Sequence, residues 1–549
     1  MRSVYFSVKG QSRIVGCVLA AVAVGLFSAA MVMGQALEEG QYGGTLVLWM
    51  QAPPNTFLPY YSLGDYARYP GYLIFDTLFA QYPDGSFKPR LAESVNISED
   101  ALTYTYTLNA SARWHDGYPV TANDVAFTIK LLAHPDYSGS NAGDVMSIAG
   151  AKEYHKGEVG DIAGVEVVDD YTIRITLEEP FAPFEEMLGT RIYILPQHLL
   201  KDIPPAELDK SAFAMNPVGS GPFTFTEYRQ GEFIRLKRFP DYHLGKPYLD
   251  EVVIRIMDPE VAVAALMTGE VDASFLAGIA PIPPESVSDL KKNPDIIVNI
   301  FDSDAFYMIC MNLQKEPLSD PRFRKALSLA IDRQALVDAV ERGYGAPACS
   351  PLPANNPFYN PELSPDPYDP EQAKALLAEV GWTGDQVLIY GTPNDPRRRK
   401  IATIVQQYLQ EVGVQTEVEV LDFPTLMAKA NEGAFDIWNI GWSSGGFQHP
   451  YYTIFYTLHS SQWPPMWNFS RYRNTQVDAL IEEGTRTTDR DRALEIFRKI
   501  QEIVAQDRPY LYLYHRQEIS AHRKRVHNFV DSPVGTTYNP HQWWVETEG

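Results

Sequence analysis

The chain has 549 residues, of which 69 are acidic and 46 basic, and its formal net charge is −23 at pH 7. A surface of this charge repels nucleic acid and anionic lipid, so we expect no nucleic-acid partner. Because the chain is longer than the roughly 250 to 300 residues at which one hydrophobic core stops growing, we expect a globular protein of two or more lobes.

The first 36 residues have the composition of a signal peptide. They carry three basic residues and no acid, followed by an apolar run over 14–33 and small residues at Gly34 and Ala36. We expect cleavage near Ala36 and a periplasmic protein. An uncleaved membrane anchor is the alternative, because the apolar run is about 20 residues long.

Strand patterns dominate the first half of the mature chain. The runs LTYTYTL (102–108) and YTIRITL (171–177) alternate between apolar and polar residues, which predicts half-exposed strands in an additional domain over about 77–190. The segment 250–276 reads strand, helix, strand, which predicts a parallel βαβ unit.

Two helices are predicted next. The run 319–343 has apolar residues at helical spacing, Asp320 as an N-cap and Gly343 at its end, which predicts one continuous helix. The run DPEQAKALLAEVGW begins a second helix at Asp369 and ends it at Gly381.

A second α/β unit follows. It contains, in order, strand QVLIY, helix 397–412, strand VQTEVEVL, helix 424–431 and strand FDIWNIG. This order predicts parallel strands, and hence a second α/β lobe. Near the end we expect a helix over 490–506, a strand LYLY over 511–514 and a packed edge at HQWWVE.

The loop GWSSGGFQHP (441–450) comes directly after the strand FDIWNIG and contains no acid. Ligands of open parallel sheets bind beyond the carboxyl ends of the strands, so we expect a pocket at this loop. Trp438 is expected in the core, whereas Trp442 leaves the strand and is expected to offer its ring to a ligand. The expected pocket is an uncharged slot lined by rings.

Collinear blocks of the chain resemble the family 5 extracellular solute-binding proteins of ABC importers, whose members mostly carry oligopeptides, dipeptides or nickel complexes. The most specific block is RLAESVNISEDALTYTYTLNASARWHDGYPVTANDVAFT (90–128). Other blocks that agree in order are NPVGSGPFTFTEY (216–228), DYHLGKPYLDEVVIRI (241–256), TGEVD (268–272), RKALSLAIDR (324–333) and GW (441–442).

The resemblance implies an α/β fold of the two-lobed periplasmic-binding-protein type, whose lobes are hinged by crossing strands and close over a ligand. It implies a signal peptide at 1–36, lobe one at 37–76, 191–300 and 515–549, an extra domain at 77–190 inserted in lobe one, and lobe two at 301–514. The implied partners are a small organic ligand and the membrane permease and ATPase subunits of an importer. We expect a monomer.

The resemblance also bears on the ligand. In peptide-binding relatives an aspartate a few residues after the GW pair holds the ligand's terminal ammonium, and no acid is present between Ser443 and His449. A buried ammonium without its counter-charge costs about 3 to 5 kcal/mol, so either another carboxylate replaces the aspartate or the ligand has no such amine. An oligopeptide is the first expectation. An oligosaccharide is the alternative, and a sensor or chaperone with the same fold is third.

The residues expected to contact the ligand lie on both lobes. They are Trp442, Gly441, Ser443, Ser444, Asn439 and His449 on lobe two, faced by Trp49, Gln51 and Tyr514.

The sequence gives little support for metal binding or catalysis. His449 and His459 lack a third ligand at fixed spacing, so we expect no metal, and no cofactor is implied. The motifs HExxH and GxxxxGK[ST] do not occur, so we expect no enzyme. Cys310 and Cys349 are equally consistent with one disulfide and with two buried thiols.

Overall fold

The computed structural model describes residues 38–61, 65–275, 278–532 and 535–547. The expected signal peptide therefore lies outside the described residues. Within these ranges, no helix has both the length and the apolar character that a membrane crossing requires.

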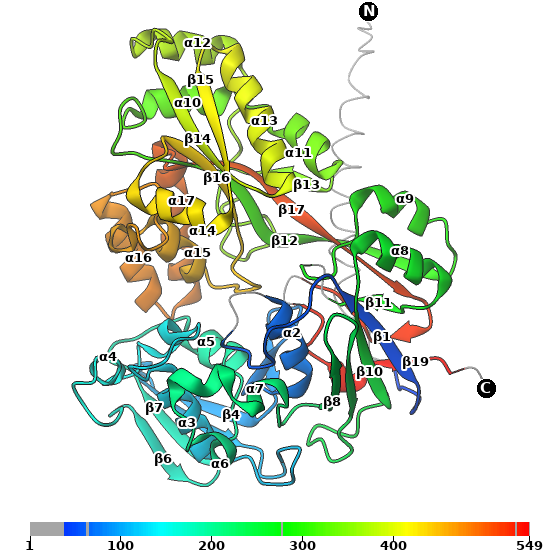
Figure 1. The fold of residues 1–549 in the computed structure, drawn as a ribbon. Coiled ribbons are helices and arrows are strands. Elements are labelled where there is room, and N and C mark those ends of the chain that lie inside the picture. Colours follow the sequence, from blue (N-terminus) through cyan, green and yellow to red (C-terminus); the bar gives the residue numbers. More distant parts are fainter. Residues whose placement is uncertain (1–37, 62–64, 276–277, 533–534, 548–549) are drawn as a thin grey trace, which may run out of the picture.

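One sheet of eleven strands extends through the molecule (Figure 1). Its strands are β1 (Thr45–Met50), β8 (Phe223–Arg229), β9 (Phe233–Arg238), β10 (Glu251–Ile256), β11 (Ala273–Ser274), β12 (Ile296–Met311), β13 (Gly345–Pro347), β14 (Val387–Pro393), β15 (Gln415–Leu421), β16 (Ile437–Trp442) and β17 (Tyr510–Arg523). The order is β15-β14-β16-β12-β17-β11-β1-β10-β9-β8, with β13 paired to β17. We call the part that holds β14 to β16 lobe two and the part that holds β1 and β8 to β11 lobe one. The expected α/β fold of two lobes is confirmed.

The long strands β12 and β17 join the two lobes. They pair antiparallel from Ile296 and Arg523 in lobe one to Cys310 and Tyr510 in lobe two. The register shifts between Asp302 and Phe306, so the residues between these two positions leave the ladder. Such an irregularity bends a strand and re-aims its side chains, and here it lies at the crossing between the lobes.

Both predicted βαβ units are present. In lobe two, β14 is parallel to β15 and β16, and the chain crosses between the strands through α13 (Pro396–Glu411) and α14 (Phe423–Glu432). In lobe one, β1 is parallel to β10 and β11, which are joined by α8 (Pro259–Thr268). The side chains of Asp395 and Asp422 accept the backbone N–H groups of Arg398 and Thr425, which caps α13 and α14.

The prediction of one helix over 319–343 is wrong. The chain forms α10 (Pro321–Leu329) and α11 (Arg333–Glu341) instead. The side chain of Asp332 accepts the N–H of Ala335 at 2.9 Å and is the N-cap of α11. An N-cap residue has a non-helical backbone, so this internal aspartate divides the run although its apolar spacing is continuous.

A second sheet stands apart from the first. It has the antiparallel order β4-β5-β7-β6, with β4 (Ala92–Ile97), β5 (Thr103–Leu108), β6 (Val165–Asp169) and β7 (Thr172–Thr176). The predicted strands 102–108 and 171–177 are its central pair. Two short pairs complete the strands, namely β2 (Phe79–Gln81) with β3 (Phe87–Pro89) and β18 (Val526–His527) with β19 (Trp544–Val545).

The remaining helices surround these sheets (Figure 1). They are α2 (Asp65–Ile74), α3 (Ala122–Leu132), α4 (Ala151–His155), α5 (Phe184–Arg191), α6 (Gln197–Leu200), α7 (Ala212–Met215), α9 (Val287–Leu290), α12 (Pro370–Glu379), α15 (Tyr451–Leu458), α16 (Thr475–Arg486) and α17 (Arg490–Asp507).

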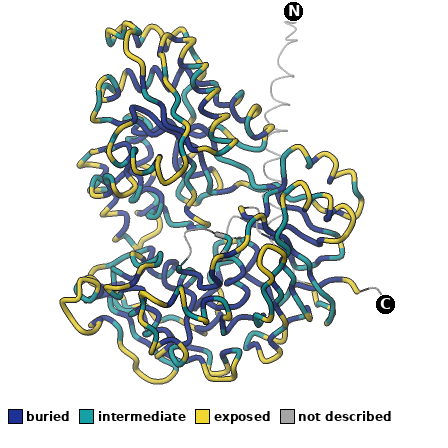
Figure 2. The backbone as a smooth tube through the Cα atoms, in the orientation of Figure 1, coloured by how far each residue is buried: buried dark blue, intermediate teal, exposed yellow. Residues whose placement is uncertain are grey.

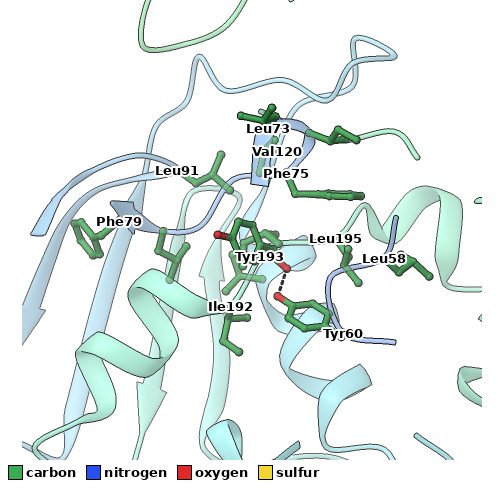
Figure 3. Close-up of a cluster of buried hydrophobic side chains, with 14 of the residues drawn as sticks. Leu58, Tyr60, Leu73, Phe75, Phe79, Leu91, Val120, Ile192, Tyr193 and Leu195 are labelled. Atoms are coloured by element: carbon green, nitrogen blue, oxygen red, sulfur yellow. Dashed lines mark hydrogen bonds between the residues drawn. The ribbon is translucent and has the colours of Figure 1, made fainter. Parts of the chain in front are cut away.

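Each lobe has its own buried interior (Figure 2). In lobe one, an apolar cluster includes Tyr60, Phe79 and Tyr193, and the Tyr60 hydroxyl donates a hydrogen bond of 2.6 Å to the Tyr193 carbonyl (Figure 3). In lobe two, Trp438 is buried as expected. Cys310 and Cys349 are both free thiols rather than a disulfide, but only Cys310 is buried, since Cys349 is half-buried.

Candidate functional site

A cavity of about 350 Å³ lies between the lobes, within the usual size of ligand sites. Lobe two contributes Ser443 and Gly445 to Phe447, and the hinge contributes residues of β12 and β17. The wall from lobe one includes tyrosines of α2, the strand β2, the end of α5 and the segment around 531–538. The predicted loop therefore lies at the cavity between the lobes.

The loop lacks an acid of its own, but the hinge strand supplies one. Asp304, in the irregular part of β12, accepts hydrogen bonds from the hydroxyls of Ser443 at 2.9 Å and Ser444 at 2.5 Å. It also accepts the N–H of Gly446 at 3.1 Å. Gly446 has φ of 84°, which favours glycine at this turn. Asp304 lines the cavity and forms no ion pair within the described residues.

The side chain of Arg191 also contacts this loop. The Arg191 guanidinium, at the end of α5, donates to the carbonyl of Ser444 at 3.2 Å. It lies 5.2 Å from the ring centroid of Phe447 and 5.3 Å from that of Tyr452, which are cation–π distances. Arg191 lines the cavity and, among the residues described, has no carboxylate as an ion-pair partner.

A buried glutamate joins the loop to lobe one. Glu186, on α5, accepts the N–H groups of Gln448 at 2.8 Å and His449 at 3.1 Å. It also accepts the side-chain amide of Gln81 at 2.9 Å. Burial raises the pKa of Glu186, while these donors and Arg191 lower it. The loop is therefore held by carboxylates from the hinge and from the opposite lobe.

Replacing Glu186 with Gln is expected to weaken ligand binding by up to about tenfold. The Gln side chain has only one oxygen that accepts, so its NH2 group would face a backbone N–H of the loop. The Kd of any bound ligand, measured by calorimetry, checks this. Glu185→Gln removes the same charge from the same helix, and Glu185 makes no hydrogen bond to the loop in the structure. Equal losses in both variants would show that the loop contact does not matter.

Two further ion pairs involve charged residues of the cavity wall. Arg516 and Glu518 of β17 form an ion pair with each other. Arg90 pairs with Asp76, which lies behind the wall, at 3.4 Å. The expectation of an uncharged slot is therefore wrong, because the charges come from strands and helices far from the loop in sequence. The expected rings are present, but most of them are tyrosines of lobe one.

The structure places only some of the predicted contact residues of lobe two at the cavity. Ser443 lines the cavity, and Ser444 lies beneath it at 5% exposure. Gly441 and Trp442 are half-buried, and the Trp442 ring packs against Tyr452 and Trp467 at centroid distances of 6.3 and 5.8 Å. Trp442 supports the loop from behind and is not part of the cavity wall.

The other two predicted residues of lobe two also lie behind the loop. Asn439 is buried, and its amide donates to the Arg398 carbonyl at 3.1 Å. The His449 ring packs edge-on against Phe497, and burial lowers its pKa to about 3. These side chains fix the loop from within lobe two.

The residues expected to face them do not reach the cavity. Trp49 is fully buried beneath α8, because a parallel strand in the middle of a sheet is covered on both faces. Gln51 is exposed beyond the end of β1. Tyr514 is buried in lobe two, where its hydroxyl donates to Glu341 at 2.8 Å.

Sequence reasoning missed most of the wall, including Asp304, Arg191 and the tyrosines of lobe one. One signal for Asp304 is present in the sequence, since the polar residues DSD interrupt the otherwise apolar run IIVNIFDSDAFYMICM. Arg191 and the tyrosines carry no comparable local signal, because the fold alone brings them to the loop.

Comparison with known proteins places the chain among binding proteins. Residues 86–464 match the model described as "Bacterial extracellular solute-binding proteins, family 5 Middle". The oligopeptide-binding protein AppA of Bacillus subtilis is 28% identical, with 92% of each chain covered. The glutathione-binding protein GsiB of Pectobacterium atrosepticum is 30% identical over 81% of this chain and 83% of its own.

Solved structures agree with this match. The structure of AppA from Bacillus subtilis in complex with a nonapeptide superimposes with a TM-score of 0.77 at 26% identity, covering 93% of this chain and all of that one (100%). The ABC transporter substrate-binding protein CtaP from Listeria monocytogenes gives a TM-score of 0.80 at 29% identity, covering 92% and 100%.

Proposed function

This chain belongs to family 5 of the bacterial extracellular solute-binding proteins of ABC importers, and from that premise we propose that it captures an oligopeptide between its lobes and delivers it to a membrane permease. The names of its relatives support this ligand class, since AppA is called an oligopeptide-binding protein and was solved with a nonapeptide.

One observation carries the proposal for this chain. Asp304 and Arg191 have opposite charges, line one cavity, and form no ion pair within the described residues. A zwitterionic peptide satisfies both, with its ammonium on Asp304 and a carboxylate on Arg191. A neutral sugar can offer both groups hydroxyl hydrogen bonds but neutralises neither charge, so closure around it would desolvate both charges without an opposite charge to compensate them. The aromatic wall fits either ligand, so an oligosaccharide remains the alternative.

The proposed mechanism follows from the hinge. Closure about β12 and β17 excludes water and strengthens both charge pairs, and reopening at the permease releases the peptide. We assign lobe one to 37–76, 191–300 and 515–549, with an inserted domain at 77–190, and lobe two to 301–514. The proposed state is an exported monomer that has no enzymatic activity and works with permease and ATPase subunits.

A ligand panel tests the ligand class. Tripeptides with free termini are expected to stabilise the protein by about 2.7 kcal/mol at 100 times their Kd, read as a rise in Tm. The same peptides with acetylated and amidated ends are expected to give much smaller shifts, and maltotriose none. A shift with maltotriose but not with free peptides would support the oligosaccharide instead.

A further inference from the structure

A third acid, Asp531, lines the cavity from lobe one. It lies in the segment that follows β17 and β18, and only 8% of its surface is exposed. Its Oδ2 atom is buried and has no hydrogen-bond partner among the described residues. Buried polar atoms are nearly always partnered, so an unsatisfied carboxylate oxygen in the wall of a ligand cavity points to a group that the ligand brings.

The charges of the cavity lead to the same conclusion. Arg516 is paired with Glu518, and Arg90 with Asp76. A zwitterionic ligand takes Asp304 and Arg191, which leaves Asp531 as the remaining charged side chain of the described wall. A ligand with one additional positive charge would therefore balance the site.

Among the described residues, no unpaired cation competes for Asp531. The pKa of Asp531 is raised to about 7, chiefly by burial, with a smaller upward contribution from Glu518 and a downward one from the Ser520 hydroxyl. Tyr538 interacts with Asp531 from the same segment, and Arg516 is engaged by Glu518. A ligand cation beside Asp531 would favour the ionised form.

We propose that Asp531 is a second anionic subsite that receives a cationic side chain of the ligand, so that the preferred solutes are peptides with a basic residue in addition to their terminal ammonium. This inference rests on the proposed function. It concerns which peptides bind, whereas the proposed function concerns whether peptides bind.

The test compares tripeptides that differ only by lysine or norleucine, with the substitution moved through the three positions. At one position, the lysine peptide is expected to bind at least about tenfold more tightly than its norleucine counterpart, as measured by calorimetry. Asp531→Asn is expected to abolish this preference and to leave norleucine peptides unaffected. Asp304→Asn, by contrast, is expected to weaken both peptides equally.

A pH series on the unmodified protein tests the same subsite without a variant. Since the free carboxyl has a pKa of about 7 and the ligand binds its ionised form, affinity for the lysine peptide should be full above this pKa. The terminal ammonium, whose pKa is about 7.7 to 8.0, affects both peptides equally, so the affinity ratio of the lysine to the norleucine peptide should fall about tenfold from pH 8 to pH 6.

Three results would overturn the inference while leaving the proposed function standing. These are the absence of a lysine preference at every position, a lysine preference that persists in Asp531→Asn, and an equal loss of norleucine binding in that variant. Failure of every peptide to bind the unmodified protein would instead refute the proposed function.

Discussion

Replacing Asp304 with Asn is expected to weaken the binding of a free-amine peptide by about 30- to 100-fold, because removing one member of a desolvated charge pair costs about 2 to 3 kcal/mol. The amide oxygen can still accept from Ser444 and Gly446, and its NH2 group can donate to the Ser443 hydroxyl, so the fold around these residues should remain intact. Calorimetry gives the Kd, and an unchanged Tm of the empty protein verifies folding.

Asp302→Asn is the matched control for this variant. Asp302 lies two residues earlier on the same strand, is exposed, and accepts a hydrogen bond from the Gln517 amide at 2.9 Å. It is not part of the cavity wall, so its replacement should change the Kd by less than about twofold. If both variants bind peptide as well as the unmodified protein does, Asp304 does not hold the ammonium.

Replacing Arg191 with Gln is the second change with a large expected effect. The variant loses the partner of the ligand's carboxylate and the guanidinium that lies over Phe447 and Tyr452. We expect about a 30-fold loss of affinity for peptides with a free carboxylate, corresponding to about 2 kcal/mol. For amidated peptides the loss should stay below about fivefold.

The control for Arg191 is Arg174→Gln. Arg174 lies on β7 and pairs with Glu166 at 2.6 Å on the surface, away from the cavity, so removing it should leave the Kd unchanged. A loss of affinity in Arg191→Gln that is the same for free and amidated peptides would mean that Arg191 only supports the loop.

The sequence predicted the regular parts of the fold well, because period and capping are local. The strand and helix order from β14 to β16 and the central pair β5 and β7 follow directly from apolar spacing. The division of 319–343 into α10 and α11 depended on a single capping aspartate within a continuous helical pattern, and there the spacing was misleading.

The sequence predicted where the candidate site lies but not which side chains form it. The loop after β16 lies at the cavity because ligand sites gather at the carboxyl ends of parallel strands. Which side chains line the cavity depends on how the lobes meet. Asp304 lies in the irregular part of β12, and Arg191 is the last residue of α5. The sequence around residue 441 gives no sign that either side chain lies beside the loop.

The most direct test of the central claim is to identify the solute that the protein itself retains. Mass spectrometry of the material released from gently denatured protein is expected to detect short peptides with free amino termini, and these should be depleted in Asp304→Asn and Arg191→Gln. Release of an oligosaccharide, undiminished in both variants, would contradict a cavity whose opposite charges hold a peptide.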